Sequence, residues 1–370
     1  MATLYTALRD AVERGAGPGL LMVPGEADFA PALARITQPL DGVDVVIATS
    51  GSTDGRGHLV GIALPALLAS ATATLERLGG PGQWLTSLPV HHVAGFQVVL
   101  RSAVAGIEPV VYAPRAGLDP ALLADRVAAM RTTDVPRYLS LVPTQLARAL
   151  ATAPALLTSF AAVLVGGAGL APDVAARART AGMRVVTTYG MTETSGGCVY
   201  DGFPLRGARV RLVDGRIHLA GPMLATRYLD TDAQPFVRLD GERWLATADL
   251  GEWVDGALRV LGRADDVIIS GGVNVNPHDV EQVLARLDGQ WVVVPVPDAT
   301  WGQLVVAVTD CERSLDAVRA ATADLPAALR PRAVVRAGEF HFRGPGKVDR
   351  RAMAALAAAE LAAGRGERRH

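Results

Sequence analysis

The chain has 370 residues, half of them hydrophobic and a fifth charged, so it can bury a sizeable core and its composition argues against intrinsic disorder. Its 36 Lys and Arg residues nearly balance its 37 Asp and Glu residues, which leaves no basic excess to neutralise a nucleic-acid backbone. The two cysteines, Cys198 and Cys311, stand in no metal-ligand or disulfide spacing, which favours a reduced, cytoplasmic setting.

Residues 1–15 show no basic stretch followed by an apolar one, so we expect no secretory signal there. The most apolar region, Leu59–Ala73, is interrupted by Pro65 and is too short to span a membrane. We therefore expect it to form a buried helix.

Strand-like and helix-like segments alternate between residues 43 and 190. Short β-branched runs predict strands, and they are Val43–Thr49, Pro109–Tyr112, Tyr138–Val142, Ala162–Val165 and Arg184–Thr188. Helix-like stretches such as Pro120–Arg131 and Pro172–Ala181 separate them. This alternation predicts a layered α/β sheet.

Beyond Gly190 the pattern changes to antiparallel hairpins. Asp214-Gly215 stands between the apolar runs Val210–Val213 and Ile217–Leu219, and Asp255-Gly256 stands between Glu252–Val254 and Leu258–Leu261. Asp-Gly between two such runs favours a tight hairpin turn, because Gly adopts positive φ at low cost.

A third pattern begins near Gly262–Asp265 and predicts a small α+β unit. Helices are expected at Pro277–Leu287 and Leu315–Asp324, and strands at Trp291–Val296 and Leu304–Thr309. The polar, basic residues Gly364–His370 are expected to fray. The predicted fold is thus α/β: a large N-terminal layered α/β domain with an antiparallel β portion, then a small α+β domain.

Four segments carry residue types suited to phosphate chemistry. The first, residues 49–57 (TSGSTDGRG), directly follows a predicted strand. Its glycines and hydroxyls could point several donors at one anion; the alternative is an ordinary Ser/Gly-rich surface turn. It lacks the Gly-Lys-Ser/Thr ending of a Walker A loop, which disfavours a plain P-loop hydrolase.

The second segment, residues 187–194 (TTYGMTET), places Glu193 between two threonine hydroxyls. A carboxylate in this setting could hold Mg²⁺, which prefers oxygen ligands shared with substrate phosphates, and Tyr189 could stack on a base. The alternative is a helix start, capped by Thr192 with Glu193 favouring the helix dipole.

The third segment combines residues 247–249 (TAD) with residues 262–266 (GRADD). The Asp249 carboxylate could accept two vicinal hydroxyls, and the Arg263 guanidinium could donate to hydroxyl and phosphate oxygens; hairpin-turn residues are the alternative. The fourth, residues 344–349 (GPGKVD), places Lys347 on a glycine-rich loop, where a solvated charge is the alternative.

In order and spacing, these segments resemble the adenylate-forming superfamily of acyl-CoA synthetases, luciferases and peptide-synthetase adenylation domains, over residues 43–352. The resemblance implies an N-terminal domain, residues 1–263, that holds the ATP and acyl pockets. A small mobile C-terminal lid, residues 264–370, would rotate between two half-reactions about a hinge at Asp265. ATP and CoA would be co-substrates, with Mg²⁺ as the metal.

The resemblance also implies a role for each matched residue. ATP binding falls to Thr49, Ser50, Gly51, Ser52, Thr53, Arg56, Gly166, Gly167, Ala168, Thr188, Tyr189, Gly190, Thr192, Asp249 and Arg263. The catalytic residues would be Lys347, His92, Thr192 and Glu193, with Glu193 also the magnesium ligand. The acyl substrate would contact His92, Thr144, Ser195 and Gly196, and CoA would pass Gly271 and Gly272.

Within the superfamily, three segments most resemble the o-succinylbenzoate–CoA ligases of menaquinone biosynthesis: residues 88–95 (LPVHHVAG), 140–146 (SLVPTQL) and 189–202 (YGMTETSGGCVYDG). The resemblance implies a small aromatic carboxylate as substrate, with CoA as acceptor; a carrier-protein thiol and a non-catalytic binding protein are the alternatives. A satisfied core histidine is the alternative for His92. Arg148 is a candidate for the substrate's second carboxylate, against an exposed helix arginine. A homodimer is compatible with these partners.

The phosphate loop departs from the superfamily pattern at two positions. Asp54 stands where the superfamily usually has Gly, and Gly57 stands where it usually has Lys. An added carboxylate and a missing ammonium each weaken the attraction for a triphosphate, by about 1 kcal/mol when partly screened. We expect Arg56 to compensate from the neighbouring position.

Overall fold

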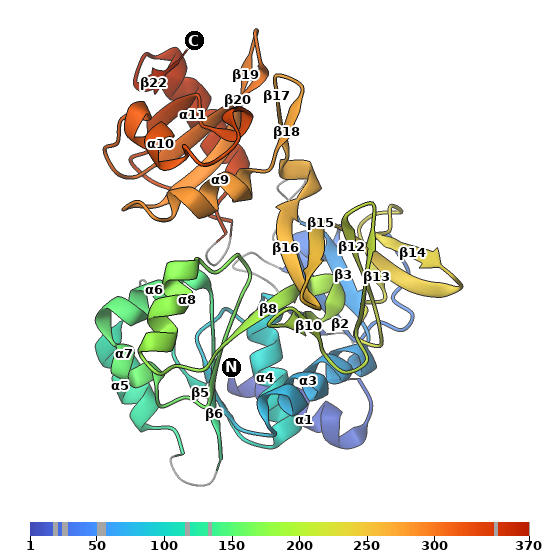
Figure 1. Ribbon diagram of the computed structural model, residues 1–370. Helices are drawn as coiled ribbons and strands as arrows, with labels where there is room; N and C mark the ends of the chain where they lie inside the picture. The colour runs from blue at the N-terminus through green and yellow to red at the C-terminus, as the bar shows by residue number, and fades with distance from the viewer. Residues whose placement is uncertain are drawn as a thin grey trace. The chain divides into compact units, whose positions relative to one another are not determined.

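The computed structural model describes residues 1–17, 21–23, 29–49, 57–114, 119–131, 135–343 and 347–369. The chain divides into two compact units (Figure 1): unit 1 comprises Met1–Arg211 and His218–Thr247, and unit 2 comprises Leu212–Ile217 and Ala248–His370. The chain passes between the units within strands β11 (Arg209–Val213), β12 (Arg216–Ala220) and β15 (Glu242–Val254). The functional boundary expected between residues 263 and 264 stays a prediction.

Unit 1 contains a seven-stranded sheet of order β10-β9-β8-β7-β6-β4-β5. The strands from β8 to β5 pair in parallel, while β8–β9 and β9–β10 pair antiparallel. Their bounds are β4 Gln83–Thr86, β5 Val110–Val111, β6 Arg137–Leu141, β7 Ala162–Gly166, β8 Val185–Met191, β9 Gly196–Tyr200 and β10 Phe203–Pro204. The predicted α/β layer is therefore confirmed, with β8 extending three residues beyond the apolar run.

Helices cover both faces of this sheet (Figure 1). Leu123 and Val127 of α5, Leu146 of α6 and Ala178 of α8 pack against one face, while α3 and α4 pack against the other through Leu75 and Val98, among others. The bounds are α3 Leu64–Leu78, α4 Val93–Ala105, α5 Pro120–Ala128, α6 Pro143–Thr152, α7 Pro154–Leu157 and α8 Pro172–Thr180. Four of them begin with proline, whose fixed φ suits the first helical turn.

A second sheet in unit 1 has the order β1-β2-β3-β13. Its strands are β1 Leu21–Val23, β2 Val45–Ala48, β3 Leu59–Ile62 and β13 Arg227–Tyr228. The helix expected over residues 59–73 is therefore wrong at its start: Leu59–Ile62 pairs antiparallel with β2, and the helix begins only at Leu64. Apolar, β-branched residues fit a buried strand as well as a buried helix, and pairing with β2 decided between them. Helices α1 (Ala2–Arg14) and α2 (Phe29–Leu33) complete this region.

Both predicted Asp-Gly hairpins are confirmed. Asp214 and Gly215 have φ of 49° and 76°, and Asp255 and Gly256 have φ of 50° and 79°, as a turn with two left-handed residues requires. A third such pair, Asp240-Gly241 with φ of 52° and 80°, connects β14 (Phe236–Leu239) to β15. Strand β16 (Ala257–Arg263) then pairs with residues 249–254 of β15.

Unit 2 also contains a six-stranded sheet of order β18-β17-β20-β21-β22, in which β19 pairs with β20. Alternate residues of β19 point to opposite faces: Val292 and Val294 pack with Met353 of α11, and Val293 packs with Val280 of α9. The bounds are β17 Ile268–Ser270, β18 Val273–Val275, β19 Trp291–Asp298, β20 Gly302–Thr309, β21 Ala333–Arg336, β22 Gly366–Arg368, α9 Pro277–Leu284, α10 Leu315–Ala321 and α11 Arg350–Ala362. The predicted α+β unit is confirmed.

The expected fraying of residues 364–370 is wrong for most of this segment. Strand β22 pairs antiparallel with β21, joining Ala333 to Arg368 and Val335 to Gly366, and Arg368 forms an ion pair with Asp298. Backbone pairing thus orders a segment whose polar composition gives no strand signal. Among the described residues, no helix combines the length and the apolar composition needed to cross a bilayer.

Candidate functional site at the carboxyl edge of the parallel sheet

The sequence motifs of unit 1 follow neighbouring strands of the parallel sheet. His92 follows β4, Thr144 follows β6, Gly166–Ala168 ends β7, and Thr192 follows β8. The registers place β4, β6, β7 and β8 side by side in this order. Because the carboxyl ends of parallel strands meet at one edge of a sheet, these segments share the edge where α/β proteins bind ligands.

The backbone at the end of β7 requires glycine. A Cβ on Gly166 would lie 2.1 Å from Thr188 Oγ1 of the paired strand, and Gly167 has a φ of 85°. Gly167 and Ala168 are exposed beyond the strand. The segment predicted to bind adenine therefore presents bare backbone beside Thr188 and Tyr189, a surface on which a flat base could lie.

A tight turn, Thr192–Gly196, follows β8. The Thr194 hydroxyl accepts a hydrogen bond from Met191 N at 2.9 Å and donates to Gly196 O at 2.7 Å. Ser195 and Gly196 have φ of 53° and 105°, and Thr192–Thr194 form a 3₁₀ turn. The helix start of the alternative interpretation is therefore a single 3₁₀ turn, in which the Thr194 hydroxyl satisfies Met191 N and Gly196 O.

Helix α4 and a distant loop hold this turn in place. Gln97 of α4, fully buried, donates from Nε2 to Ser195 O at 2.8 Å. The Ser195 hydroxyl donates to Met223 O at 2.8 Å, and Ala225 N donates to Glu193 O at 2.8 Å. The Ser195 side chain is itself fully buried, and its hydrogen bond to Met223 O holds the turn in place. Its predicted contact with the substrate stays a prediction.

Glu193 carries a buried carboxylate with one neutral partner. Its side chain accepts a hydrogen bond from Tyr228 Oη at 2.5 Å, and the residue is 7% exposed. No arginine, lysine or histidine of the described chain forms an ion pair with it. Because a buried charge is normally paired or bound to a metal, and carboxylate oxygen is the ligand that Mg²⁺ prefers, Glu193 fits a magnesium ligand.

Tyr228 also links Glu193 to the base of the predicted phosphate loop. Its ring stacks on His58, with centroids 4.4 Å apart and planes inclined by 19°. His58 N donates to Thr49 Oγ1 at 2.8 Å, and Thr49 N donates to His58 O at 2.8 Å. Ser50, Gly51, Ser52, Thr53, Asp54 and Arg56 lie outside the described residues.

Asp230 fixes the same junction from the other side. His58 Nδ1 lies 3.3 Å from Asp230 Oδ1, and Arg35 Nη2 lies 2.5 Å from Asp230 Oδ2. Arg35 also donates to Gly57 O, where the loop returns to β3. Sequence reasoning missed Tyr228, Asp230 and Arg35, because none lies in a glycine-rich or hydroxyl-rich segment. It also missed His58, although His58 directly follows residues 49–57.

Two of the four predicted acyl-site residues, His92 and Thr144, lie at helix starts. His92 is the N-cap position of α4, half-buried, with its ring 4.4 Å from that of His91. A Cβ on Gly95 would lie 2.2 Å from Pro89 O, so Gly95 permits the close turn that positions His92. Thr144 and Arg148 are exposed on α6, which is compatible with both interpretations of Arg148.

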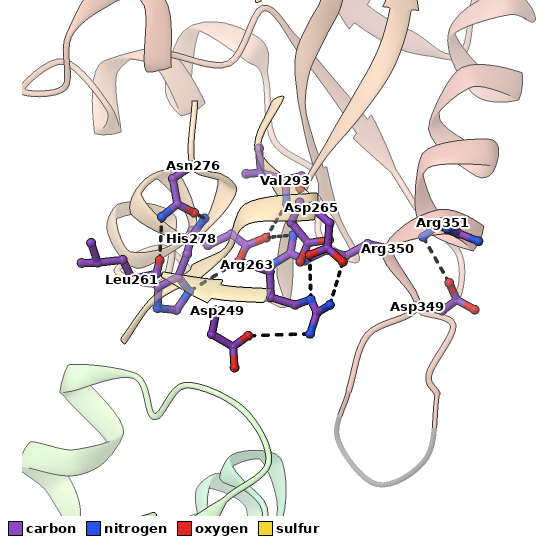
Figure 2. Close-up of polar contacts among 12 residues, drawn as sticks. Asp249, Leu261, Arg263, Asp265, Asn276, His278, Val293, Asp349, Arg350 and Arg351 are labelled. Atoms are coloured by element: carbon purple, nitrogen blue, oxygen red, sulfur yellow. Dashed lines mark hydrogen bonds and ion pairs between the residues drawn. The ribbon is translucent and has the colours of Figure 1, made fainter. Parts of the chain in front are cut away.

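In unit 2, the predicted ribose partners face each other across one strand pair. Asp249 of β15 pairs in register with Arg263 of β16, with Arg263 Nη1 3.6 Å from Asp249 Oδ1. Arg263 also donates to the predicted hinge residue, Asp265, from Nε at 2.8 Å and from Nη2 at 2.6 Å (Figure 2). Burial opposes the charge of Arg263, but these carboxylates raise its pKa, so it stays a cation.

The predicted CoA residues lie on a hairpin of unit 2, and the predicted catalytic lysine lies next to the antiparallel bridge between Phe342 and Val348. Gly271 and Gly272, with φ of 58° and 78°, turn β17 into β18, and a Cβ on Gly271 would lie 2.7 Å from the Trp301 ring. Lys347 is exposed and its carbonyl accepts a hydrogen bond from Arg343 N at 2.7 Å. It is also the one lysine among the chain's 36 Lys and Arg residues.

A family profile described as AMP-binding enzyme matches residues 18–229, more than half of the chain. The chain belongs to this family. The predicted membership in the adenylate-forming superfamily is thereby confirmed, and the edge of the parallel sheet described above lies largely within the matched region.

Individual relatives agree with this assignment. A "Probable 2-succinylbenzoate--CoA ligase" of Mycobacterium tuberculosis is 39% identical over 92% of this chain and 91% of its own length. A 2-succinylbenzoate–CoA ligase of Enterococcus faecalis is 30% identical over 84% of this chain and 68% of its own. The resemblance to o-succinylbenzoate–CoA ligases is therefore confirmed at the level of sequence relatives.

Solved structures of this family share the fold. A variant of E. coli MenE with bound OSB-AMS has a TM-score of 0.73 at 28% identity, covering 92% of this chain and 77% of that one. The o-succinylbenzoate CoA synthetase MenE of Bacillus subtilis, in complex with OSB-AMP, has a TM-score of 0.75 at 22% identity, covering 94% and 80%. The fold class predicted from the sequence is confirmed.

Proposed function

We propose that this AMP-binding enzyme is an ATP-dependent acid–CoA ligase whose acid is o-succinylbenzoate. In the first half-reaction, a carboxylate oxygen attacks the α-phosphorus of ATP, and the bond to pyrophosphate breaks to give an acyl-adenylate. In the second, the CoA sulfur attacks the acyl carbon, AMP leaves, and the thiol proton is released. The names of the relatives support this substrate, and a place in menaquinone biosynthesis follows from it.

The buried Glu193 carboxylate carries the proposal on the structural side. It lies on a rigid turn at the ligand-binding edge and is joined through Tyr228 and His58 to the base of the Thr49 loop. A metal ion there would neutralise phosphate oxygens and orient them for in-line attack. Glu193 would hold it, and Thr192 on the same turn would contact the α-phosphate.

The remaining roles are proposals of the same kind. Asp249 and Arg263 would hold the ribose, and the exposed backbone of Gly166–Ala168 would hold the adenine with Tyr189-Gly190. His92 and Thr144 would line the acyl site with the Ser195-Gly196 backbone, and Gly271-Gly272 would line the pantetheine route. Lys347 would neutralise charge in the first half-reaction, with residues 264–370 acting as a lid that turns at Asp265. A cytoplasmic setting and a homodimer also stay predictions.

Product analysis with a panel of acids tests the proposed activity. With Mg-ATP and CoA present, we expect o-succinylbenzoate to release AMP fastest and to yield its CoA thioester, identified by mass. Adenylate formation without a CoA thioester would favour a carrier-protein thiol as acceptor. If no acid supported pyrophosphate exchange, the chain would be a binding protein without turnover, and the proposal would fail.

Arg56 is expected to compensate for the altered phosphate loop. Replacing Arg56 with alanine should raise the KM for ATP several-fold, because it removes a cation beside the triphosphate in a loop that already has Asp54 and lacks lysine at position 57. A loss of about 1 kcal/mol corresponds to roughly fivefold. Steady-state kinetics against ATP measure it, and an unchanged KM would remove Arg56 from the site.

A further inference from the structure

The loop that carries Lys347 is closed at its base by backbone contacts. Phe342 and Val348 form an antiparallel bridge, Arg343 N donates to Lys347 O at 2.7 Å, and Asp349 N donates to His341 O at 2.8 Å. Residues 341–343 and 347–349 therefore lie side by side. The Lys347 side chain is exposed.

An ion pair crosses the same base. Arg343 Nε lies 2.7 Å from Asp349 Oδ2, and the two side chains are 20% and 21% exposed. The hydrogen bond from Arg343 is the main reason that the pKa of Asp349 lies below its ordinary value. The pair is thus more sheltered than an ordinary surface pair and joins the residues that flank the loop.

The other carboxylate oxygen of Asp349 caps the N-terminus of helix α11. Oδ1 accepts hydrogen bonds from Arg351 N and Ala352 N, both at 3.1 Å, as an N-cap (Figure 2). Such a cap satisfies orphan amide groups of the first helical turn. One carboxylate therefore caps the helix with one oxygen and receives Arg343 with the other.

Helix α11, which Asp349 caps, is held in place by buried side chains and by an ion pair. Met353 and Ala357 are fully buried against the sheet of unit 2. Arg350, directly after Asp349, donates to Val293 O at 2.9 Å (Figure 2). It also donates to Glu281 at 2.6 and 2.7 Å. The Arg343–Asp349 ion pair thus connects the residue that precedes the Lys347 loop to the start of helix α11. The buried contacts of Met353 and Ala357 and the Arg350–Glu281 ion pair hold this helix in place.

We propose that Arg343 is a positioning residue for the first half-reaction, which fixes the base of the Lys347 loop to helix α11 through Asp349. The inference rests on the proposed function, because it concerns the residue assigned to adenylation. Catalysis by a placed charge depends on position to within about 1 Å. Without the pair, the loop ends would sample more conformations and Lys347 would spend less time in the productive one.

Half-reaction kinetics test this role. Arg343→Ala should slow acyl-adenylate formation by about tenfold or more, and leave thioester formation from preformed acyl-adenylate and CoA within about twofold. Arg343→Lys should recover part of the loss. Asp349→Asn should resemble Arg343→Ala, because an amide has one oxygen, which can serve the cap or Arg343 but not both.

A matched control lies at the other end of the same helix. Arg365 donates to Glu360 from Nε at 2.8 Å and from Nη2 at 2.9 Å, so Arg365→Ala also removes an arginine–carboxylate pair from α11. It should leave both half-reactions unchanged. Equal losses in both half-reactions for Arg343→Ala, or equal losses for Arg365→Ala, would reduce Arg343 to a structural role and overturn the inference.

A second readout does not depend on activity. Because Lys347 is the one lysine in the chain, selective ¹⁵N-lysine labelling gives a single lysine backbone amide signal, whose order parameter reports the motion of this loop. The order parameter should fall in Arg343→Ala and Asp349→Asn and stay unchanged in Arg365→Ala. An unchanged value in all three variants would contradict the inference even if activity fell.

The Lys347→Ala variant separates the two possible failures. If it keeps the wild-type rate of adenylation, the role proposed for Lys347 is wrong, whatever Arg343 does. If it loses adenylation while Arg343→Ala keeps both its rate and its order parameter, only the positioning role fails. Should Arg343→Ala not fold, Arg343→Lys and Asp349→Asn carry the same comparison.

Discussion

Replacing Lys347 with alanine should slow acyl-adenylate formation about 100- to 1,000-fold and spare thioester formation from preformed acyl-adenylate. A carboxylate that attacks ATP brings two anions together, so the first half-reaction needs a positive charge placed between them. Removal of one such stabilising group typically costs this much. The second half-reaction joins a thiol to an activated acyl group, and it does not require a positive charge between two anions.

The composition of the chain sharpens this prediction. Lys347 is the only lysine in a sequence that otherwise uses arginine for its cations, and a compact ammonium and a planar guanidinium are not equivalent at a reacting centre. Lys347→Arg should therefore restore only part of the adenylation rate. Rapid-quench measurements of pyrophosphate and thioester formation would decide it, and wild-type adenylation by Lys347→Ala would exclude the assignment.

Replacing Arg350 with alanine should destabilise unit 2 by about 3 kcal/mol, the lower end of the range for breaking a buried pair. Arg350 donates two hydrogen bonds to Glu281 and lies 3.5 Å from Asp266. The Glu281 side chain is 14% exposed, so its charge would lose its main partner while it stays buried. Arg350 is itself 28% exposed, which keeps the estimate at the lower end.

Local hydrogen exchange measures this effect better than a single unfolding curve, because two units need not unfold together. Peptides from α9 and β19 should lose protection in Arg350→Ala, since Val293 N donates to Glu281 Oε1 at 2.7 Å. Arg365→Ala, which removes a solvent-screened surface pair, should leave protection nearly unchanged. Equal effects of the two variants would refute the prediction.

The same network predicts a dependence on pH. Burial alone would raise the pKa of Glu281, but Arg350 and hydrogen bonds from His278 and Val293 lower it below its ordinary value. A carboxylate with a lowered folded-state pKa stabilises the fold above its unfolded pKa of about 4.3, and this contribution disappears as pH falls through the folded value. The stability difference between wild type and Glu281→Gln should therefore shrink below about pH 4.

Local sequence determined the turns and much of the order of elements in this protein. Asp214-Gly215 and Asp255-Gly256 adopt left-handed conformations. Glycine tolerates them because it has no Cβ, and aspartate tolerates them better than most residues. The motifs after β7 and β8 could also be predicted to share a sheet edge, since parallel strands bring their carboxyl ends together. These inferences need only neighbouring residues and the geometry of one sheet.

Tertiary structure alone decided the contacts that complete the candidate site. Tyr228 donates a hydrogen bond to Glu193 and stacks on His58, and His58 N donates to Thr49 Oγ1. Thr49 and Tyr228 are nevertheless far apart in the sequence. Leu59–Ile62 became a strand because β2 offered it backbone partners, and β21 did the same for residues 366–368. The residues next to a single aromatic side chain or a short polar run do not indicate which distant groups it will contact. The conformation of such a segment is stabilised by groups that are far away in the sequence and come near only when the chain folds.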